Sequence, residues 1–259
     1  MPKISAVIIT FNEEQYIEKC LASLDGIADE IVVVDSFSTD RTEDICVKFN
    51  VRFNKHKFEG YMEQKNYALS LAAFPYVLSL DADEALSDEL KKSILNTKDN
   101  FINDGYILNR LNNYCGKWIR HSRWYPDRHL RLFNPAKGKW IGPNPHDTFK
   151  MNPGSKVTRL NGDLYHWYYA SIEEHWDKVN LFSTISANEY FSAGRKSGPF
   201  TAHMHLMWSF FRSYFLNAGF LDGYLGYTGS LITAMSSFLK YSKLRRLNIQ
   251  AKESGRSKR

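Results

Sequence analysis

Short apolar runs alternate with segments of helical periodicity along the first hundred residues. The runs are rich in β-branched residues and cover residues 4–9, 30–35, 51–53 and 76–80. Between them, apolar residues recur at helical spacing, which predicts helices after the first run, over residues 42–49 and over residues 61–72. A nearly continuous apolar run is typical of a strand that is buried on both faces. Strands that alternate with helices through short connections predict an α/β fold with a doubly wound, mainly parallel sheet.

Two polar side chains are predicted to cap helices in this half. Asn12 follows the first apolar run and precedes Glu13 and Glu14, while Asp40 precedes the second helical segment. Asn and Asp side chains accept hydrogen bonds from the free N–H groups of a helix N-terminus, and the helix dipole favours acids in the first turn. We therefore expect one helix to begin at Asn12 and the next at Asp40.

The pattern changes near Gly105. Beyond it the predicted strands cover residues 106–111, 129–133 and 157–166. They are separated by loops rich in Gly, Pro, Asn and Trp. Ser171 is followed by two glutamates, which predicts the start of a long helix that ends at Gly194.

The composition is that of a globular protein. Of the 259 residues, 43% are hydrophobic and 24% are charged, which excludes a disordered chain, a collagen-like repeat and a coiled coil. Cys20, Cys46 and Cys115 show no Cys-x-x-Cys spacing. We therefore expect reduced thiols in a cytoplasmic protein, without a disulfide framework or a structural zinc site. The first apolar run is too short for a secretory signal and is followed by acids.

The two halves of the chain carry opposite charge. Residues 1–105 hold 11 basic and 19 acidic side chains, whereas residues 106–259 hold 23 basic and 9 acidic ones. The positive excess is concentrated between Arg110 and Arg159 and again after Lys240. The acidic first half argues against nucleic acid as a partner, and the local basic zones favour phosphates, acidic sugars or an anionic membrane surface. The last stretch is equally typical of a solvated tail.

Carboxylates follow two of the predicted strands directly. Asp81 and Asp83 come after the fourth apolar run, and Asp35 ends the second run before a turn rich in hydroxyl groups. Ligands of doubly wound sheets bind at the carboxyl ends of strands, where a pair of carboxylates can hold a divalent cation that neutralises a diphosphate. Helix-capping or surface acids are the alternative. Lys65, on the third predicted helix, is either a phosphate contact or a solvated lysine.

Two common phosphate-binding motifs are absent from the sequence. No Gly-x-Gly-x-x-Gly follows the first strand, and no Gly-Lys-Ser/Thr phosphate loop occurs anywhere. These absences argue against a nicotinamide dehydrogenase and against a P-loop NTPase.

Four segments of the first third of the chain, in their order and spacing, resemble family 2 glycosyltransferases of the GT-A fold. They are ISAVIITFNEE, VVVDSFSTDRT, QKNYALSLA and LSLDADE. Four later segments are similar to the lipopolysaccharide core-biosynthesis glucosyltransferase branch of that family. They are RHLRLFNP, GPNPHDTF, LYHWYYASIEEHWDKVNLFSTISA and GFLDGYLG. The resemblance spans residues 4–245.

The resemblance also implies how the chain is organised. We expect a GT-A glycosyltransferase domain, then a C-terminal helical, aromatic-rich and membrane-associating region, then a basic tail. The expected bounds are residues 1–170 for the domain, with a nucleotide-sugar half at 1–105 and an acceptor half at 106–170, residues 171–245 for the helical region and residues 246–259 for the tail.

The resemblance implies roles for five residues. Phe11 and Asp35 would contact the nucleobase. Asp81 would contact the ribose or a metal, and Asp83 would bind the metal that bridges the diphosphate. Asp147 occupies the place where related sequences usually show a glutamate after a histidine, and it would act as the general base that deprotonates the acceptor hydroxyl.

Basic side chains and histidines are further candidates around the diphosphate. Arg123, Arg128 and Arg131 lie in the basic zone, and arginine forks bind phosphate bidentately; a solvated strand face is the alternative. His146 or His166 is a candidate metal ligand, against a purely structural role. The predicted donor site therefore also includes Lys65, Arg128 and Arg131, and the predicted metal site consists of Asp81, Asp83 and His166.

The aromatic block of residues 200–241 is not expected to span a membrane cleanly, because Gly219, Asp222 and Gly223 interrupt its apolar run. Aromatic side chains followed by basic ones suit helices that lie in the headgroup region. We expect peripheral attachment to the inner face of the cytoplasmic membrane. A homodimer interface built from the same aromatic residues is the alternative.

Together these features predict an inverting, metal-dependent glycosyltransferase. The donor would be a UDP-sugar, UDP-glucose above all, the cation Mg²⁺ or Mn²⁺, and the acceptor a heptose or related sugar of the lipopolysaccharide inner core. Three alternatives stay open: a transferase of the same fold acting on a polyprenyl phosphate or another surface glycan, a nucleotidyltransferase, and a membrane-bound sugar-nucleotide-binding protein.

Overall fold

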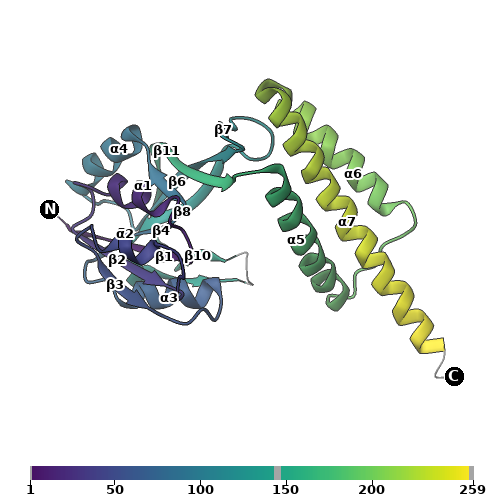
Figure 1. The fold of residues 1–259 in the computed structure, drawn as a ribbon, viewed down its shortest axis with the longest axis horizontal. Coiled ribbons are helices and arrows are strands. Elements are labelled where there is room, and N and C mark those ends of the chain that lie inside the picture. Colours follow the sequence, from purple (N-terminus) through teal and green to yellow (C-terminus); the bar gives the residue numbers. More distant parts are fainter. Residues whose placement is uncertain (1, 143–146, 257–259) are drawn as a thin grey trace. The chain divides into compact units, whose positions relative to one another are not determined.

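The computed structural model describes residues 2–142 and 147–256, and the chain forms two compact units (Figure 1). The first unit comprises Met1–Leu111 and Asp127–Trp167, and the second comprises Asn112–Pro126 and Tyr168–Arg259. The sequence-based division lies at residue 170. The structure also groups residues 112–126 with the C-terminal helices.

A mixed sheet forms the centre of the first unit. Its strands follow the order β3-β2-β1-β4-β8-β6-β11-β5. Pairing is parallel from β3 through β4, and antiparallel for β4 with β8, β8 with β6, and β11 with β5. The bounds are β1 Ile4–Thr10, β2 Glu30–Asp35, β3 Arg52–Lys55, β4 Tyr76–Asp81, β5 Glu84–Leu86, β6 Gly105–Tyr114, β8 Asp127–Phe133 and β11 Val157–Tyr169. The predicted α/β fold with a doubly wound, mainly parallel sheet is confirmed.

Helices cover both faces of this sheet, because the central strands are apolar on both sides. Along β1, Ile4, Ala6 and Ile8 enter one hydrophobic cluster, while Val7 and Ile9 pack with a second one. The first cluster includes side chains of α1 and α4, and the second includes α3 and a small antiparallel hairpin of β9 and β10. The bounds are α1 Ile17–Ser23, α2 Thr42–Cys46, α3 Tyr61–Ser70, α4 Asp88–Lys98, β9 Gly138–Ile141 and β10 Thr148–Met151.

The predicted helix start at Asn12 is wrong. The helix α1 begins at Ile17, and Asn12 adopts a positive φ of 54°. Its side-chain oxygen accepts a hydrogen bond from the backbone N–H of Thr39, at 2.8 Å. Asp40 does bind the start of α2, because its carboxylate accepts from the backbone N–H of Thr42, but it also accepts from Glu14. Both side chains therefore tie the loop after β1 to the loop after β2.

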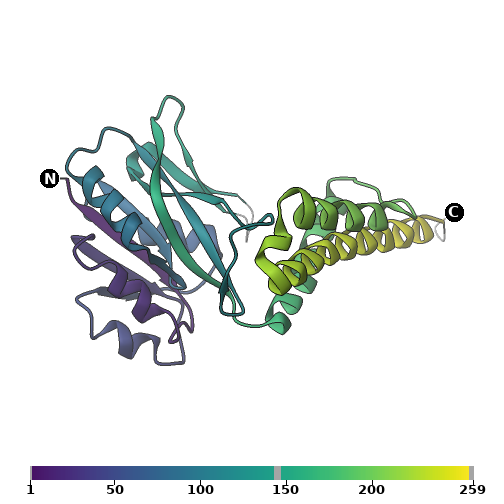
Figure 2. The ribbon, with the colours of Figure 1, turned by 90° about the horizontal axis from the view of Figure 1, so that it is seen from above.

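Three helices dominate the second unit. The helices α5 and α6 both pack along α7, as the two views of Figures 1 and 2 show. The bounds are β7 Lys117–Trp118, α5 Ile172–Ser192, α6 Thr201–Phe211, the π-helix η2 Arg212–Leu216, the 3-10 helix η3 Gly219–Asp222 and α7 Gly223–Arg256. Ser171 caps α5 as predicted, since its side chain accepts from the backbone N–H of Glu174.

The helix α7 continues well beyond the aromatic block. It runs to Arg256, so most of the segment that was predicted as a separate basic tail extends this helix instead. Within the residues that the structure describes, no helix is both long and apolar enough to cross a membrane.

Candidate active site

The carboxyl ends of three adjacent strands bring the predicted acids to one edge of the sheet. Thr10 pairs with Asp35 in the β1–β2 ladder, and Ile9 pairs with Asp81 in the β1–β4 ladder. Phe11 follows β1 directly. The register therefore places Phe11 between Asp35 and Asp81, at the edge where ligands bind in parallel sheets.

The Asp35 carboxylate organises the turn after β2. It is fully buried and accepts hydrogen bonds from the backbone N–H and the hydroxyl of Ser38. Within that turn Phe37 is held at a φ of 63° and its side chain is 55% exposed. Phe11 is 56% exposed on the neighbouring strand. Positive φ is costly for a bulky residue and tends to occur at functional sites, so Phe37 is a site candidate that sequence reasoning missed.

Asp81 lies between two cations. Its Oδ2 is 2.7 Å from Arg131 Nη2, and its Oδ1 is 3.3 Å from Lys65 Nζ. Burial alone raises the pKa of Asp81, but Arg131 and Lys65 outweigh it and hold that pKa well below its usual range. Asp81 is therefore a carboxylate at neutral pH.

A β-bulge places Arg131 next to Asp81. The β6–β8 register shifts between Tyr106 and Ile107, so β8 carries one extra residue at this point. As a result Leu130 packs against one hydrophobic cluster and Leu132 against the other, although strict alternation would place both on one face. Arg131 between them is 3% exposed.

Alternating charges continue beyond Arg131. Its Nη2 also lies 2.9 Å from Oε1 of Glu84, which is fully buried. The same glutamate oxygen is 3.4 Å from Arg110 Nη1, and Arg110 Nη2 is 2.8 Å from Asp127 Oδ2. Burial raises the pKa of Asp127, but hydrogen bonding to His129 and the charge of Arg110 lower it far more. Sequence reasoning assigned no role to Glu84, Arg110 or Asp127, although Glu84 directly follows the Asp-Ala-Asp motif.

Asp147 joins this ionic cluster through Lys65. The Lys65 ammonium is 3.0 Å from Asp147 Oδ2 and lies 4.7 Å from the centre of the Trp140 ring. Both charged side chains are at least nine-tenths buried. Lys65 was predicted to contact a phosphate, and here it bridges two carboxylates. His146, the other candidate beside Asp147, lies outside the described residues.

Asp83 and His166 form a separate pair. Asp83 Oδ2 is 3.4 Å from His166 Nε2, and the backbone carbonyl of Asp83 accepts from the N–H of Trp167. Among the described residues no three His, Cys, Asp or Glu side chains are grouped closely enough to hold a metal alone. A magnesium ion on a nucleotide, however, needs only one or two protein ligands besides the phosphates and water. Asp83 and His166 fit such a cation, whereas the Asp81 carboxylate faces Lys65 and Arg131.

The structure brings most of the predicted site residues together. Lys65, Asp81, Arg131 and Asp147 form one ionic cluster, and Phe11, Asp35 and the Asp83–His166 pair belong to the same unit. Arg128 is exposed on β8, opposite Asn109. Arg123 belongs to the second unit.

Comparison with known proteins decides the family. A family model described as Glycosyl transferase family 2 matches residues 5–156. This chain belongs to glycosyltransferase family 2. An uncharacterized glycosyltransferase of Rickettsia typhi is 32% identical over 97% of this chain and 90% of that protein. The lipopolysaccharide core biosynthesis glycosyltransferase LpsC of Rhizobium meliloti is 29% identical over 94% of this chain and 93% of its own length.

A solved structure shares the fold of this family 2 glycosyltransferase. The structure of S. aureus TarS 1-349 in complex with UDP-GlcNAc is 17% identical, with a TM-score of 0.50 over 97% of this chain and 92% of that one. The resemblance to family 2 enzymes of the GT-A fold, predicted from the sequence motifs, is confirmed.

Proposed function

We propose that this family 2 glycosyltransferase transfers a sugar, with inversion, from a UDP-sugar to a sugar of the lipopolysaccharide core. The observation that carries the proposal is the ionic cluster in which Lys65 links Asp147 to Asp81 at the carboxyl edge of the sheet. The name of LpsC supports the acceptor class, and the UDP-GlcNAc complex of TarS supports a UDP-sugar in a protein of this fold. Glucose is the donor sugar that the sequence motifs favour.

The nucleoside is bound at the loops after β1 and β2. The exposed rings of Phe11 and Phe37 offer apolar faces to a base, and the fully buried Asp35 holds the turn that carries Phe37. A planar base such as uracil can stack on these two rings.

The diphosphate is bound near Asp83 and His166, which would hold its divalent cation, Mg²⁺ or Mn²⁺. The cation would stabilise the negative charge that develops on the leaving diphosphate. Lys65 supplies a positive charge from the chain itself. Since two carboxylates share this ammonium, an incoming phosphate competes with them for it.

Asp147 acts as the general base in a single displacement. Its carboxylate takes the proton of the acceptor hydroxyl while that oxygen forms a bond to the anomeric carbon. The bond from the anomeric carbon to the diphosphate breaks on the opposite face, and UDP leaves with the electron pair. An α-linked donor therefore gives a β-linked product. The Lys65 ammonium, 3.0 Å from Asp147 Oδ2, holds this carboxylate in place.

The proposal is tested by following UDP release from a panel of nucleotide sugars, with lipopolysaccharide core acceptor and with or without Mg²⁺ or Mn²⁺. We expect release from one UDP-sugar that requires the cation and that Asp83→Ala abolishes. Asp44→Ala removes an exposed carboxylate on α2 and should leave the rate unchanged. Release of pyrophosphate from a nucleoside triphosphate would instead identify a nucleotidyltransferase. If polyprenyl phosphate stimulated UDP release and lipopolysaccharide core did not, the acceptor would be a polyprenyl phosphate.

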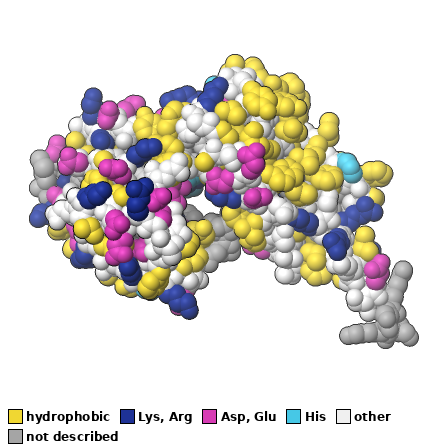
Figure 3. All heavy atoms as spheres, in the orientation of Figure 1, with side chains coloured by type: hydrophobic (Ala, Val, Ile, Leu, Met, Phe, Trp, Pro, Cys, Tyr) yellow, Lys and Arg dark blue, Asp and Glu magenta, His cyan; other side chains and the backbone are white. Residues whose placement is uncertain are grey.

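The second unit is proposed to attach the enzyme to the inner face of the cytoplasmic membrane. Hydrophobic side chains gather on its surface over α6 and the first turns of α7 (Figure 3). Those that are more than half exposed are Phe200, Met204, Met207, Trp208, Phe215, Leu216, Leu221 and Tyr224. We call this surface the aromatic face.

A basic loop is anchored to the aromatic face by Asp222. The carboxylate of Asp222 accepts from the backbone N–H groups of Arg120 and His121, and its carbonyl accepts from Lys117 Nζ at 2.6 Å. Asp222 lies in η3, between the exposed Leu221 and Tyr224. Cations beside exposed apolar groups complement a membrane that carries anionic lipids, so the charge favours a membrane over a second copy of the chain.

A further inference from the structure

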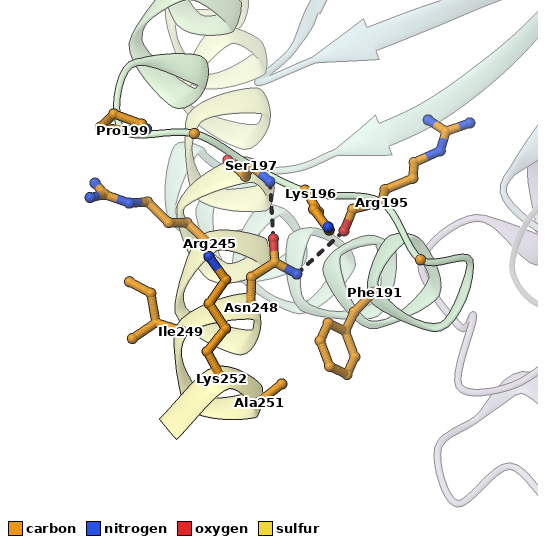
Figure 4. Close-up of a pocket in the computed structure, with 12 residues that line it drawn as sticks. Phe191, Arg195, Lys196, Ser197, Pro199, Arg245, Asn248, Ile249, Ala251 and Lys252 are labelled. Carbon is orange, nitrogen blue, oxygen red and sulfur yellow. Dashed lines mark hydrogen bonds between the residues drawn. The ribbon is translucent and has the colours of Figure 1, made fainter. Parts of the chain in front are cut away.

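A cavity of about 580 Å³ is lined by residues of the second unit alone (Figure 4). One wall is the connection from α5 to α6, from Phe191 to Pro199, and the other is the carboxyl-terminal part of α7, from Arg245 to Lys252. The volume is typical of a site for a small organic ligand rather than for a single ion.

Asn248 fixes the geometry of this cavity. Its side-chain oxygen accepts from the backbone N–H of Ser197 at 3.0 Å, and its amide donates to the carbonyl of Arg195 at 3.3 Å (Figure 4). Gly198 N–H donates to Thr201 Oγ1 at 3.0 Å. The hydrogen bonds that Asn248 of α7 makes to this connection are therefore to neutral backbone groups.

The charged residues that line the cavity are all basic. They are Arg195, Lys196, Arg245 and Lys252. Arg245 and Lys252 stand two helical turns apart on α7, on either side of Asn248, and no carboxylate within the described parts of the chain forms an ion pair with either. The Arg195 guanidinium lies over the Tyr190 ring, 4.2 Å from its centre. Arg195 therefore contributes less positive charge to the cavity than Lys196, Arg245 and Lys252.

A polar atom in the lining lacks a partner. Ser197 Oγ is buried, and within the described residues no hydrogen-bond partner reaches it. A buried hydroxyl without a partner costs about 1–3 kcal/mol. Within a cavity lined by cations, an anionic oxygen is the ligand atom that this hydroxyl would satisfy by donating its proton.

We propose that this cavity is a binding site for a phosphate group carried on a larger molecule. Arg245 and Lys252 supply the charge-assisted hydrogen bonds, and Ser197 supplies a neutral one. The exposed Phe200 follows the cavity wall in sequence and begins the aromatic face. A phosphorylated lipid headgroup and a soluble phosphate ester share this chemistry. The site is independent of the transferase mechanism proposed above.

The test measures binding directly. Glycerol 3-phosphate is titrated into the full chain and followed by NMR, and vesicles of phosphatidylcholine are compared with vesicles that also contain phosphatidylglycerol. The double variant Arg245→Gln/Lys252→Gln should weaken binding of the phosphate-bearing probe about tenfold or more, since two charge-assisted contacts are lost. In the control Arg246→Gln/Lys240→Gln, which removes as much charge from α7 outside the cavity, the loss should stay below about twofold.

A variant that changes no charge distinguishes a specific binding site from nonspecific electrostatic attraction. Asn248→Ala keeps every charge but releases the connection from α7, and we expect it to weaken binding about fivefold while the helical content stays that of the wild type. Equal loss in the cavity and control double variants, no effect of Asn248→Ala, or no binding of either probe would overturn the proposal. Binding of glycerol 3-phosphate identifies a soluble ester, and binding only of phosphatidylglycerol vesicles identifies a headgroup. UDP release from donor hydrolysis should be unaffected in all these variants, so failure here leaves the proposed function standing.

Discussion

The two units place their polar and apolar side chains in opposite ways. In the first unit, charged residues such as Arg131 and Glu84 are buried and paired, next to two well-covered hydrophobic clusters. In the second unit, α6, η2, η3 and α7 carry half of the large exposed hydrophobic side chains of the described chain. Buried charges are costly unless paired and exposed aromatic patches are costly unless covered. Each unit therefore has its costly groups at the place that we propose to bind a ligand: buried charges in the first unit and exposed apolar groups in the second.

The largest expected effect tests the ionic cluster of the first unit as a catalytic site. Replacing Asp147 by Asn keeps its size but removes the proton acceptor, so kcat should fall about 10²–10⁴-fold. The KM for the donor should change little, because the base contacts the acceptor. Steady-state kinetics of UDP release measure both. A wild-type rate in Asp147→Asn would remove this residue from the mechanism.

The next largest effect tests whether the buried ion pairs of the first unit also stabilise its fold. Glu84 accepts from Arg131, from Arg110 and from the backbone N–H of Asp81. Glu84→Gln removes the charge that the buried Arg131 and the partly buried Arg110 share, and we expect it to lower the free energy of unfolding by about 3–5 kcal/mol. Lys178→Gln breaks the exposed pair with Glu174 in the second unit and should cost less than about 0.5 kcal/mol. Urea denaturation of both variants gives the comparison. If both variants lost a similar free energy of unfolding, the buried ion pairs of the first unit would be no more stabilising than the exposed pair of the second.

Sequence predicted the strands of the first unit better than their connections. The strand β1 was recognisable because both its faces are buried, which leaves a nearly continuous apolar run. The start of α1 was misplaced because the Asn12 side chain accepts a hydrogen bond from Thr39, in a loop far away in sequence, instead of capping the helix that follows it. The helix α4 was not anticipated at all, although Ser87 caps it and Leu90 and Ile94 enter the core.

The site was predicted residue by residue but not as a network. Asp81, Asp83 and Asp147 were proposed from motifs, and chain topology brings Asp81 and Asp147 within 3.3 and 3.0 Å of one ammonium, that of Lys65. The partnership of Arg131 with Asp81 depends on a β-bulge, which changes the direction of one side chain and leaves no signal in the apolar pattern. Ion pairs between distant segments are set by tertiary structure, so the sequence identified candidates and not their partners.

Acid should affect the two units over different pH ranges. Burial, and to a lesser degree Lys178, lower the pKa of His175 from 6.5 to about 4. Above pH 6.5 the His175 side chain is neutral in both the folded and the unfolded state. As the pH falls towards 4, the unfolded state binds a proton that the folded state does not, so stability is lost over this range, by up to about 3 kcal/mol. Asp81, whose pKa is lowered, contributes stability that is lost only below the usual pKa of an aspartate.

Hydrogen exchange at a series of pH values measures this difference. The protection factors of α5 amides, corrected for the pH dependence of intrinsic exchange, should fall between pH 6.5 and 4 while those of β4 do not, and His175→Gln should remove that pH dependence. His203→Gln, which replaces an exposed histidine on α6, serves as the control. If α5 and β4 responded at the same pH, the two units would not differ in their buried titrating groups.

The smallest effect concerns the aromatic face. Because Met207 and Trp208 are 67% and 56% exposed, replacing both by Ser should leave stability within about 0.5 kcal/mol of the wild type. The same change removes apolar area that would enter the headgroup region, so binding to vesicles with anionic lipid should weaken about tenfold. Leu181→Ser alters an equally exposed side chain on α5, outside the aromatic face, and should bind as the wild type does. If vesicle binding persists in the double variant while a dimer, detected by analytical ultracentrifugation, dissociates, then the aromatic face meets a second copy of the chain and not a membrane.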